Sequence, residues 1–135
     1  MAEQSFEIQI EDELKYDIRI ENSAIASGQF YREGDQSDIL SSDDVDDMVI
    51  RHNGGRRSIC IRGDRDSVSE AQGSIDLIDD ITDARICSLA WNASMQPGKR
   101  NEFETMNQDN RYTVDVGNWS KSGAMGTIPV TIKQT

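Results

Sequence analysis

The chain has 135 residues, of which 25 are acidic and 14 are basic, so its formal net charge at pH 7 is −11. This length predicts a single domain over residues 1–135, large enough to fold without disulfide bonds. The acidic charge disfavours nucleic acid and anionic membranes as ligands, because proteins bind both mainly through Lys and Arg. The charge is uneven, since residues 1–50 hold fourteen acidic and only three basic side chains.

The sequence gives no sign of insertion into a membrane or of a leader. It lacks an apolar run of about 18 residues, and Met1–Ser5 has neither a basic nor an apolar region of a signal peptide. We therefore expect a soluble protein that is cytoplasmic or released by a non-classical route. Cys60 and Cys87 are too few for a disulfide framework and are expected to be two free, partly buried thiols.

Alternation of apolar and polar residues predicts a chain built from short strands. Residues 6–10 and 16–20 alternate cleanly and are joined by a polar turn. Further strands are predicted at 24–32 (interrupted at Gly28), 48–50, 57–62, 74–78, 85–91, 103–106, 112–116 and 126–132. Loops are expected at 34–37, 63–72 and 92–101, and no helix is expected. About ten short strands with turns between them predict an all-β fold, a sandwich or a barrel.

The last strand contains a proline. Ile128, Val130 and Ile132 alternate with Pro129 and Thr131, which predicts a half-buried strand close to the end of the chain. Because proline cannot donate a ladder hydrogen bond, this strand is expected at a sheet edge or with a bulge.

Residues for enzyme or metal chemistry are sparse. His52 is the single histidine, and no neighbouring signature supplies a nucleophile and an orienting group, so we predict no enzyme. No Cys/His spacing fits zinc. Asp43–Asp47 lacks the alternating oxygens, central glycine and final glutamate of a calcium loop, so we expect a solvated acidic loop. Neither a metal nor a cofactor is predicted.

Three stretches resemble the aegerolysin family, and the resemblance runs over nearly the whole chain. The most specific is Ser122–Val130, close to the family's Ser-Gly-Ala-Leu-Gly-Thr-Ile-x-Val; the others are Ser27–Asp35 and Gly73–Asp79. The chain is most similar to bacterial members. The resemblance implies a β-sandwich, similar to actinoporins, that binds sphingolipids such as ceramide phosphoethanolamine or sphingomyelin with cholesterol. It also implies, for some members, a larger perforin-like (MACPF) partner that forms the pore.

The resemblance further implies a lipid site, which mushroom members build from tryptophans, a glutamate and a lysine on loops at one end. Lys99 matches the lysine, and Glu70 lies one position from the glutamate. Ser27 and Gln96 stand where mushroom members have tryptophans, so two aromatic anchors are missing.

Four aromatic residues complete the expected lipid site. Phe6 and Tyr112 stand where mushroom members have tryptophans, and Trp91 matches a tryptophan at a strand end. Trp119 is extra in this chain and would compensate in part if its loop lies at the same end.

The expected chemistry favours an ethanolamine headgroup. Lys99 is expected to pair with the lipid phosphate. Glu70 is expected to accept from a primary ammonium, which has hydrogens to donate, whereas quaternary choline has none. The rival interpretation is a protein–protein adaptor whose acidic first third binds a basic partner without any lipid. The oligomeric state stays open, and the strands are too short for a spanning hairpin, so we expect binding without perforation.

Overall fold

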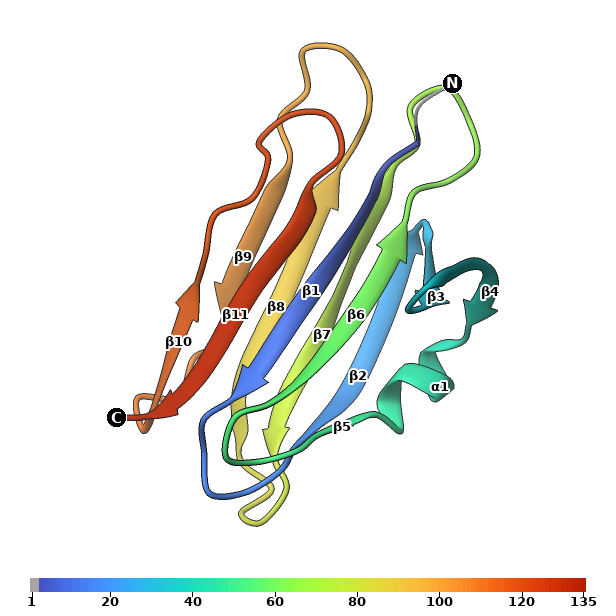
Figure 1. The fold of residues 1–135 in the computed structure, drawn as a ribbon. Coiled ribbons are helices and arrows are strands. Elements are labelled where there is room, and N and C mark those ends of the chain that lie inside the picture. The colour runs from blue at the N-terminus through green and yellow to red at the C-terminus, as the bar shows by residue number, and fades with distance from the viewer. Residues whose placement is uncertain (1–2) are drawn as a thin grey trace.

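The computed structural model describes residues 3–135, which form eleven strands and one short helix in two packed sheets (Figure 1). The six-stranded sheet has the order β10 (Tyr112–Val116), β11 (Gly126–Gln134), β1 (Ser5–Asp12), β6 (Gly55–Arg62), β3 (Gln29–Arg32), β4 (Asp35–Leu40). The five-stranded sheet has the order β5 (Val49–Ile50), β2 (Ile18–Ser27), β7 (Ala71–Asp79), β8 (Arg85–Ala93), β9 (Glu102–Met106). The predicted all-β sandwich is confirmed.

The core lies between the two sheets and consists mainly of isoleucine. Ile8 and Ile10 from one sheet and Ile20 and Ile75 from the other are fully buried. Successive side chains of a strand point to opposite faces, so the alternation in sequence places every second residue in this layer. Each such side chain contributes roughly 1.5–3 kcal/mol by leaving water.

The expectation that the last strand lies at an edge is wrong, because β11 runs between β1 and β10. Its antiparallel pairing with β10 ends at Val116 opposite Val130. Just beyond this ladder, the carbonyl of Pro129 accepts a hydrogen bond from the Gly117 N–H at 2.8 Å. The N–H and carbonyl of a strand residue point to the same side, so the donor that proline lacks would also face the end of this ladder. An interior strand tolerates Pro129 for this reason.

Two segments expected to be loops are regular elements instead. Residues 34–37 mostly belong to β4, which pairs with β3. The acidic stretch 43–47 mostly lies in the helix α1 (Ser42–Asp46). Ser41 caps this helix: its hydroxyl accepts from the Asp44 N–H, and the Asp44 carboxylate accepts from the Ser41 N–H. Val45 anchors the helix by being fully buried.

Gly28 lets the chain pass from one sheet to the other between β2 and β3. Its φ is +86°, and a Cβ atom there would lie 2.4 Å from the Arg62 carbonyl oxygen. A glycine is therefore required on both conformational and steric grounds. The predicted interruption at this residue is confirmed.

The two cysteines are free and buried, as the sequence predicts. Burial raises the pKa of both the Cys60 and the Cys87 thiol to about 12. Both side chains therefore act as small apolar core residues rather than as reactive thiolates.

Candidate functional site

One end of the sandwich gathers three connections, and we call it the loop end: residues 63–70, 94–101 and 117–125. These segments link β6 to β7, β8 to β9 and β10 to β11. The chain also enters β1 at this end, and the turn at Gly28 lies there (Figure 1). The alternating strand directions therefore bring segments far apart in sequence to one surface.

Two buried amide side chains hold this end together, and we call them the Gln4–Asn101 cluster. Gln4 is fully buried; its Nε2 donates to the Gly123 carbonyl at 2.9 Å, and its Oε1 accepts from the Met125 N–H at 2.8 Å. Asn101 is also buried, and its Nδ2 donates to the carbonyls of Ser120 at 3.1 Å and Gly123 at 2.7 Å. Both side chains thereby fix the segment 117–125.

The same two side chains reach the other loops. The Oδ1 of Asn101 accepts from the Nε2 of Gln4 at 3.3 Å and from the Ser94 N–H at 3.2 Å. The backbone N–H of Gln4 donates to the Oγ of Ser69 at 2.9 Å. One buried cluster thus joins the chain before β1 to all three loops, and every polar atom of its two amides has a partner. Single polar residues carry no sequence pattern, so sequence reasoning missed this cluster.

An exposed ion pair stands at the loop end between Lys99 and Glu70. The Nζ of Lys99 lies 3.2 Å from the Oε1 of Glu70, and both side chains are nearly half exposed. The structure thus brings together the two charged residues that the sequence predicts for the site. An exposed pair of this kind contributes only about 0–1 kcal/mol to folding, so a ligand can separate it at little cost.

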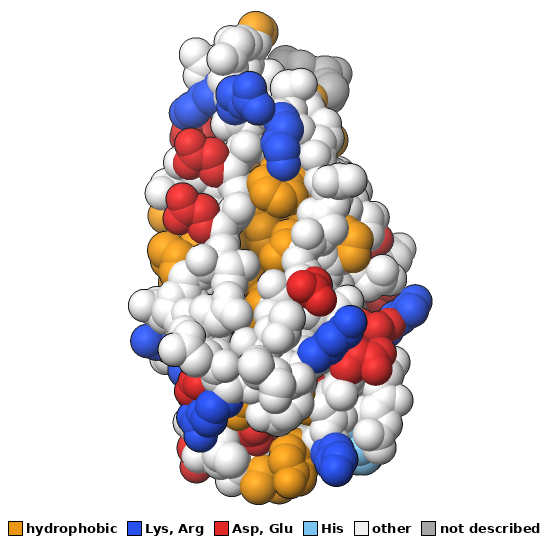
Figure 2. Space-filling view, turned by 90° about the vertical axis from the view of Figure 1, so that its left-hand side faces the viewer, with side chains coloured by type: hydrophobic (Ala, Val, Ile, Leu, Met, Phe, Trp, Pro, Cys, Tyr) orange, Lys and Arg blue, Asp and Glu red, His pale blue; other side chains and the backbone are white. Residues whose placement is uncertain are grey.

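A tryptophan and a lysine of another loop lie at the same end of the sandwich. The Nζ of Lys121 sits 3.0 Å from the ring centroid of Trp119, whose ring packs edge-on against Phe103 at 5.8 Å. The segments 94–101 and 117–125 contain three basic residues and no acidic one. Figure 2 shows Lys and Arg side chains gathered near one end of the molecule, above a strip of hydrophobic side chains. Sequence reasoning did not single out Lys121.

Trp119 therefore lies at the same end as the ion pair. This position was the condition under which Trp119 would compensate in part for the tryptophans that Ser27 and Gln96 replace. Gln96 is exposed in the segment 94–101, and its N–H donates to the Oγ of Ser94 at 3.0 Å. Ser27 closes β2 next to the Gly28 turn and is half-buried. All three residues accompany Glu70 and Lys99 at the loop end.

The other three predicted site residues are elsewhere. Phe6 and Trp91 are 3% and 2% exposed and pack edge-to-face inside the sandwich, with ring centroids 6.1 Å apart. Tyr112 begins β10 at the opposite end, where its hydroxyl donates to the buried Asp79 at 2.7 Å. Phe6 and Trp91 are therefore core residues, and the structure does not bring Tyr112 to the loop end.

Neither metal-binding groups nor membrane-spanning helices stand out. Within residues 3–135, no three or more His, Cys, Asp or Glu side chains are grouped so as to hold a metal ion. In the same part of the chain, no helix has the length and apolar character that a membrane span requires.

Comparison with known proteins identifies relatives along the entire described chain. The family model for aegerolysins matches residues 3–135. Terrelysin of Aspergillus terreus is 34% identical over 128 residues, covering 93% of this chain and 84% of terrelysin. Asp-hemolysin of Aspergillus fumigatus is 29% identical over 116 residues, covering 85% of this chain and 81% of its own length.

Solved structures share the fold. IP-1A of Alcaligenes faecalis superimposes with a TM-score of 0.84 at 25% identity, covering 98% of this chain and 91% of that chain. RahU, solved in complex with a TRIS molecule, superimposes with a TM-score of 0.87, covering 98% of this chain and 96% of RahU. The sequence also suggests a likeness to RahU in particular, but 19% identity shows the shared fold alone.

Proposed function

The chain belongs to the aegerolysin family, and from this premise we propose that it binds sphingolipid-containing membranes with its loop end, as the recognition component of a two-component cytolysin. The single observation that carries the proposal is the exposed Lys99–Glu70 ion pair at the loop end, where Lys121 also covers the ring of Trp119. The hemolysin name of one relative supports a role at membranes. The protein would act at the surface of a target membrane.

The ion pair suits a zwitterionic headgroup. A phosphate can replace Glu70 as the partner of Lys99 while the lipid ammonium replaces Lys99 as the partner of Glu70, so every charge stays paired. A purely anionic headgroup would leave Glu70 without a cation. The geometry therefore favours phosphosphingolipids over anionic lipids.

Within the zwitterionic lipids, the site favours ethanolamine over choline. A primary ammonium can donate hydrogen bonds to Glu70, whereas a quaternary ammonium prefers a cage of aromatic faces. Ser27 and Gln96 provide no such faces, and the ring of Trp119 is already covered by Lys121. Ceramide phosphoethanolamine is therefore the proposed lipid, with sphingomyelin as the weaker ligand.

We expect the protein to sediment with vesicles containing ceramide phosphoethanolamine and cholesterol, and to bind sphingomyelin–cholesterol vesicles less tightly. Lys99→Gln and Glu70→Gln should each weaken binding to the preferred vesicles by about tenfold, because each removes one charge-assisted hydrogen bond of roughly 1.5–3 kcal/mol. Vesicle co-sedimentation with varied lipid concentration measures both effects.

Matched controls for these variants are Lys133→Gln and Asp115→Asn, which break an exposed ion pair between β11 and β10 with the same changes of charge. They should bind like the wild type. Equal binding to both vesicle types would contradict the ethanolamine preference. No binding to any sphingolipid vesicle would overturn the proposed function and favour the adaptor that uses the acidic first third.

The purified protein should not release dye from vesicles that it saturates. A spanning hairpin needs two strands of about 9–11 residues with a continuous lipid-facing apolar side. The expectation that the strands are too short is wrong, since β2 has ten residues and β7, β8 and β11 have nine. Their apolar sides instead face the shared core of the sandwich and are not available to lipid. Lysis should require a second, perforin-like protein. Rapid dye release by this chain alone would contradict the two-component proposal.

A further inference from the structure

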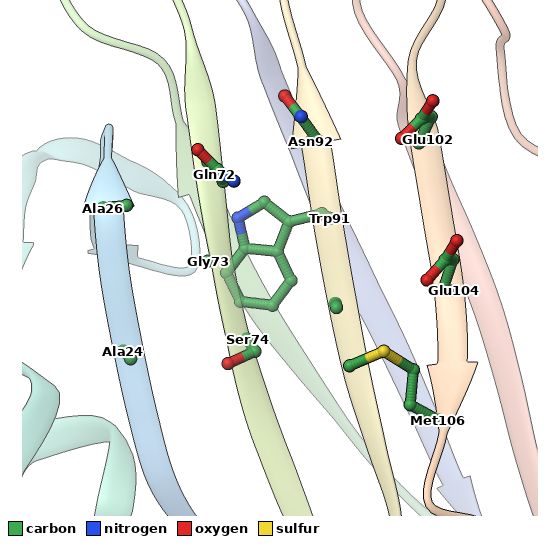
Figure 3. A pocket seen from close by; sticks show the side chains of 11 residues that line it. Ala24, Ala26, Gln72, Gly73, Ser74, Trp91, Asn92, Glu102, Glu104 and Met106 are labelled. Atoms are coloured by element: carbon green, nitrogen blue, oxygen red, sulfur yellow. The ribbon is translucent and has the colours of Figure 1, made fainter.

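The outer face of the five-stranded sheet carries a groove of about 420 Å³ that the lipid site does not use. It crosses the strands β2, β7, β8 and β9 near the loop end of the sheet (Figure 3). This face points away from the core, so the groove is open to solvent. Its lining combines small floor residues with longer polar residues.

The groove arises from the register of the strands. Ala24, Ser74, Ala90 and Glu104 face one another in a row across the sheet. The first three side chains are short and leave a trough, while Glu104 closes it at the edge strand β9. Met106 borders the trough on the same strand.

The adjacent row of the sheet supplies polar groups. Gln72, Asn92 and Glu102 pair across β7, β8 and β9 and border the groove. Among residues 3–135, the carboxylates of Glu102 and Glu104 enter no ion pair or hydrogen bond. Two amides and two carboxylates thus converge on the trough without internal partners, as in a small-molecule site.

The ring of Trp91 closes the groove from the core side of the sheet, where it packs against Phe6. Trp91 lies across the position of Gly73 in Figure 3 and is only 2% exposed. Its indole Nε1 has no hydrogen-bond partner within the described chain. A side chain at Gly73 would collide with this ring, since a Cβ atom there would lie 2.8 Å from the Cζ2 atom of Trp91.

We propose that this groove binds a small hydroxylated organic cation, of the amino-alcohol class. The ammonium pairs with Glu102 and Glu104, which lack another cation, and the hydroxyl groups bond with the amides of Gln72 and Asn92. The apolar carbons lie on the alanine floor. Such a cation is either free in solution or the end of a lipid headgroup. The headgroup could reach the groove because Glu70 lies two residues before Gln72, and this second source rests on the proposed function.

The test is a titration of ¹⁵N-labelled protein with ethanolamine hydrochloride in phosphate buffer, with glucose and sodium chloride as controls. We expect amide shifts at residues 72–74, 90–92 and 102–106, and only with ethanolamine. Glu102→Gln/Glu104→Gln should weaken the affinity by about fivefold or more, as loss of an exposed ion pair of roughly 1 kcal/mol requires. Ala90→Phe, which fills the trough and keeps the charge, should weaken it as well.

A matched control is Glu33→Gln/Asp43→Asn, which changes the charge equally at exposed positions outside the groove and should titrate like the wild type. Co-sedimentation of the Glu102→Gln/Glu104→Gln variant with ceramide phosphoethanolamine vesicles separates the two sources. Unchanged vesicle binding with lost ethanolamine shifts identifies a free amine, and loss of both identifies the headgroup. Absent shifts in the groove, or equal loss in the control variant, would overturn the proposal whether or not the protein binds membranes.

Discussion

Asp12→Asn is expected to abolish most of the loss of stability that the wild-type protein shows between about pH 4 and pH 8. Asp12 ends β1 and is completely buried. Its Oδ1 accepts from the Leu14 N–H at 2.8 Å, but its Oδ2 has no hydrogen-bond partner within the described chain. A charge on this carboxyl is therefore poorly compensated.

Burial raises the pKa of Asp12 from 3.8 to about 7. The hydrogen bond from Leu14 and the charge of His52 lower this pKa, and the carboxylates of Asp17 and Asp79 raise it. Because the folded pKa lies above the unfolded one, the contribution to stability is complete below about pH 4 and is lost as the pH rises through 7. The raised pKa corresponds to roughly 4 kcal/mol of unfolding free energy.

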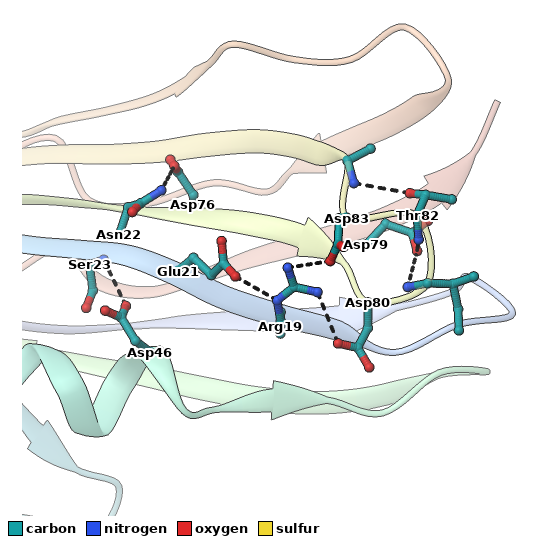
Figure 4. A network of polar contacts seen from close by, with 12 residues as sticks. Arg19, Glu21, Asn22, Ser23, Asp46, Asp76, Asp79, Asp80, Thr82 and Asp83 are labelled. Atoms are coloured by element: carbon teal, nitrogen blue, oxygen red, sulfur yellow. Dashed lines mark hydrogen bonds and ion pairs between the residues drawn. The ribbon is translucent and has the colours of Figure 1, made fainter.

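Asp79, an almost equally buried carboxylate, behaves differently. Burial raises its pKa, but hydrogen bonds from the Tyr112 hydroxyl and the N–H groups of Ile81 and Thr82 outweigh burial, and the pKa is lowered. Figure 4 shows Asp79 in the turn with Thr82, beside the ion pairs of Arg19. Its contribution to stability is therefore lost only as the pH falls below the usual range of Asp. Above about pH 5, the change of the unfolding free energy with pH therefore comes mainly from Asp12.

Urea unfolding of the wild type and of Asp12→Asn at several pH values measures this effect. The amide keeps the acceptor for Leu14 and carries no charge, so its unfolding free energy should change little from pH 5 to pH 8. At pH 8 the variant should be the more stable protein. Asp115→Asn, at an exposed position, is the control that should keep the wild-type slope. If the unfolding free energy of Asp12→Asn falls with pH as steeply as that of the wild type, a group other than Asp12 causes the loss of stability.

Local patterns were sufficient for most strands, as β1 shows. Its alternation from Phe6 to Ile10 is a local property, and it fixes which face is buried. The order of strands is set by contacts far apart in sequence. The parallel pairing of β1 with β11 is one example, and it made the expectation of an edge at Pro129 wrong. The helix α1 was missed because one buried residue, Val45, is too little for a helical period.

The charged pair of the site came from the resemblance to a family, and the structure places its two members in contact. The buried residues that hold the loops of this pair in place could not be predicted from the sequence. Gln4 and Asn101 are 97 positions apart, and nothing in their local sequence indicates burial or contact. The same holds for Tyr112, whose place at the opposite end depends on the direction of β10.

Asn101→Ala is expected to loosen the whole loop end and to weaken vesicle binding by about tenfold or more. The side chain makes four hydrogen bonds, which involve Gln4, Ser94, Ser120 and Gly123. Its removal leaves buried donors and acceptors unpaired, at a cost of roughly 2–4 kcal/mol in unfolding free energy. Lys99 lies two residues before Asn101, so the charged pair loses its fixed place on the sandwich.

Stability alone does not account for the expected loss of binding, and a core variant separates the two effects. Ile86→Ala in β8 removes a fully buried side chain far from the loops and should cost roughly 2–5 kcal/mol. It should nevertheless bind ceramide phosphoethanolamine vesicles like the wild type, because the Gln4–Asn101 cluster stays intact. Asn101→Ala should bind weakly under conditions where both variants are fully folded by circular dichroism.

Hydrogen exchange locates the cause of this difference. In Asn101→Ala, exchange should accelerate in the segments 94–101 and 117–125, while amides of the central strand β1 remain protected. In Ile86→Ala, the loops should exchange at the wild-type rate. If Asn101→Ala loosens both loops and still binds vesicles as tightly as the wild type, the buried cluster serves folding alone and does not position the lipid site. If neither loop loosens, the segments are held by other contacts, and the hydrogen bonds of Asn101 are dispensable.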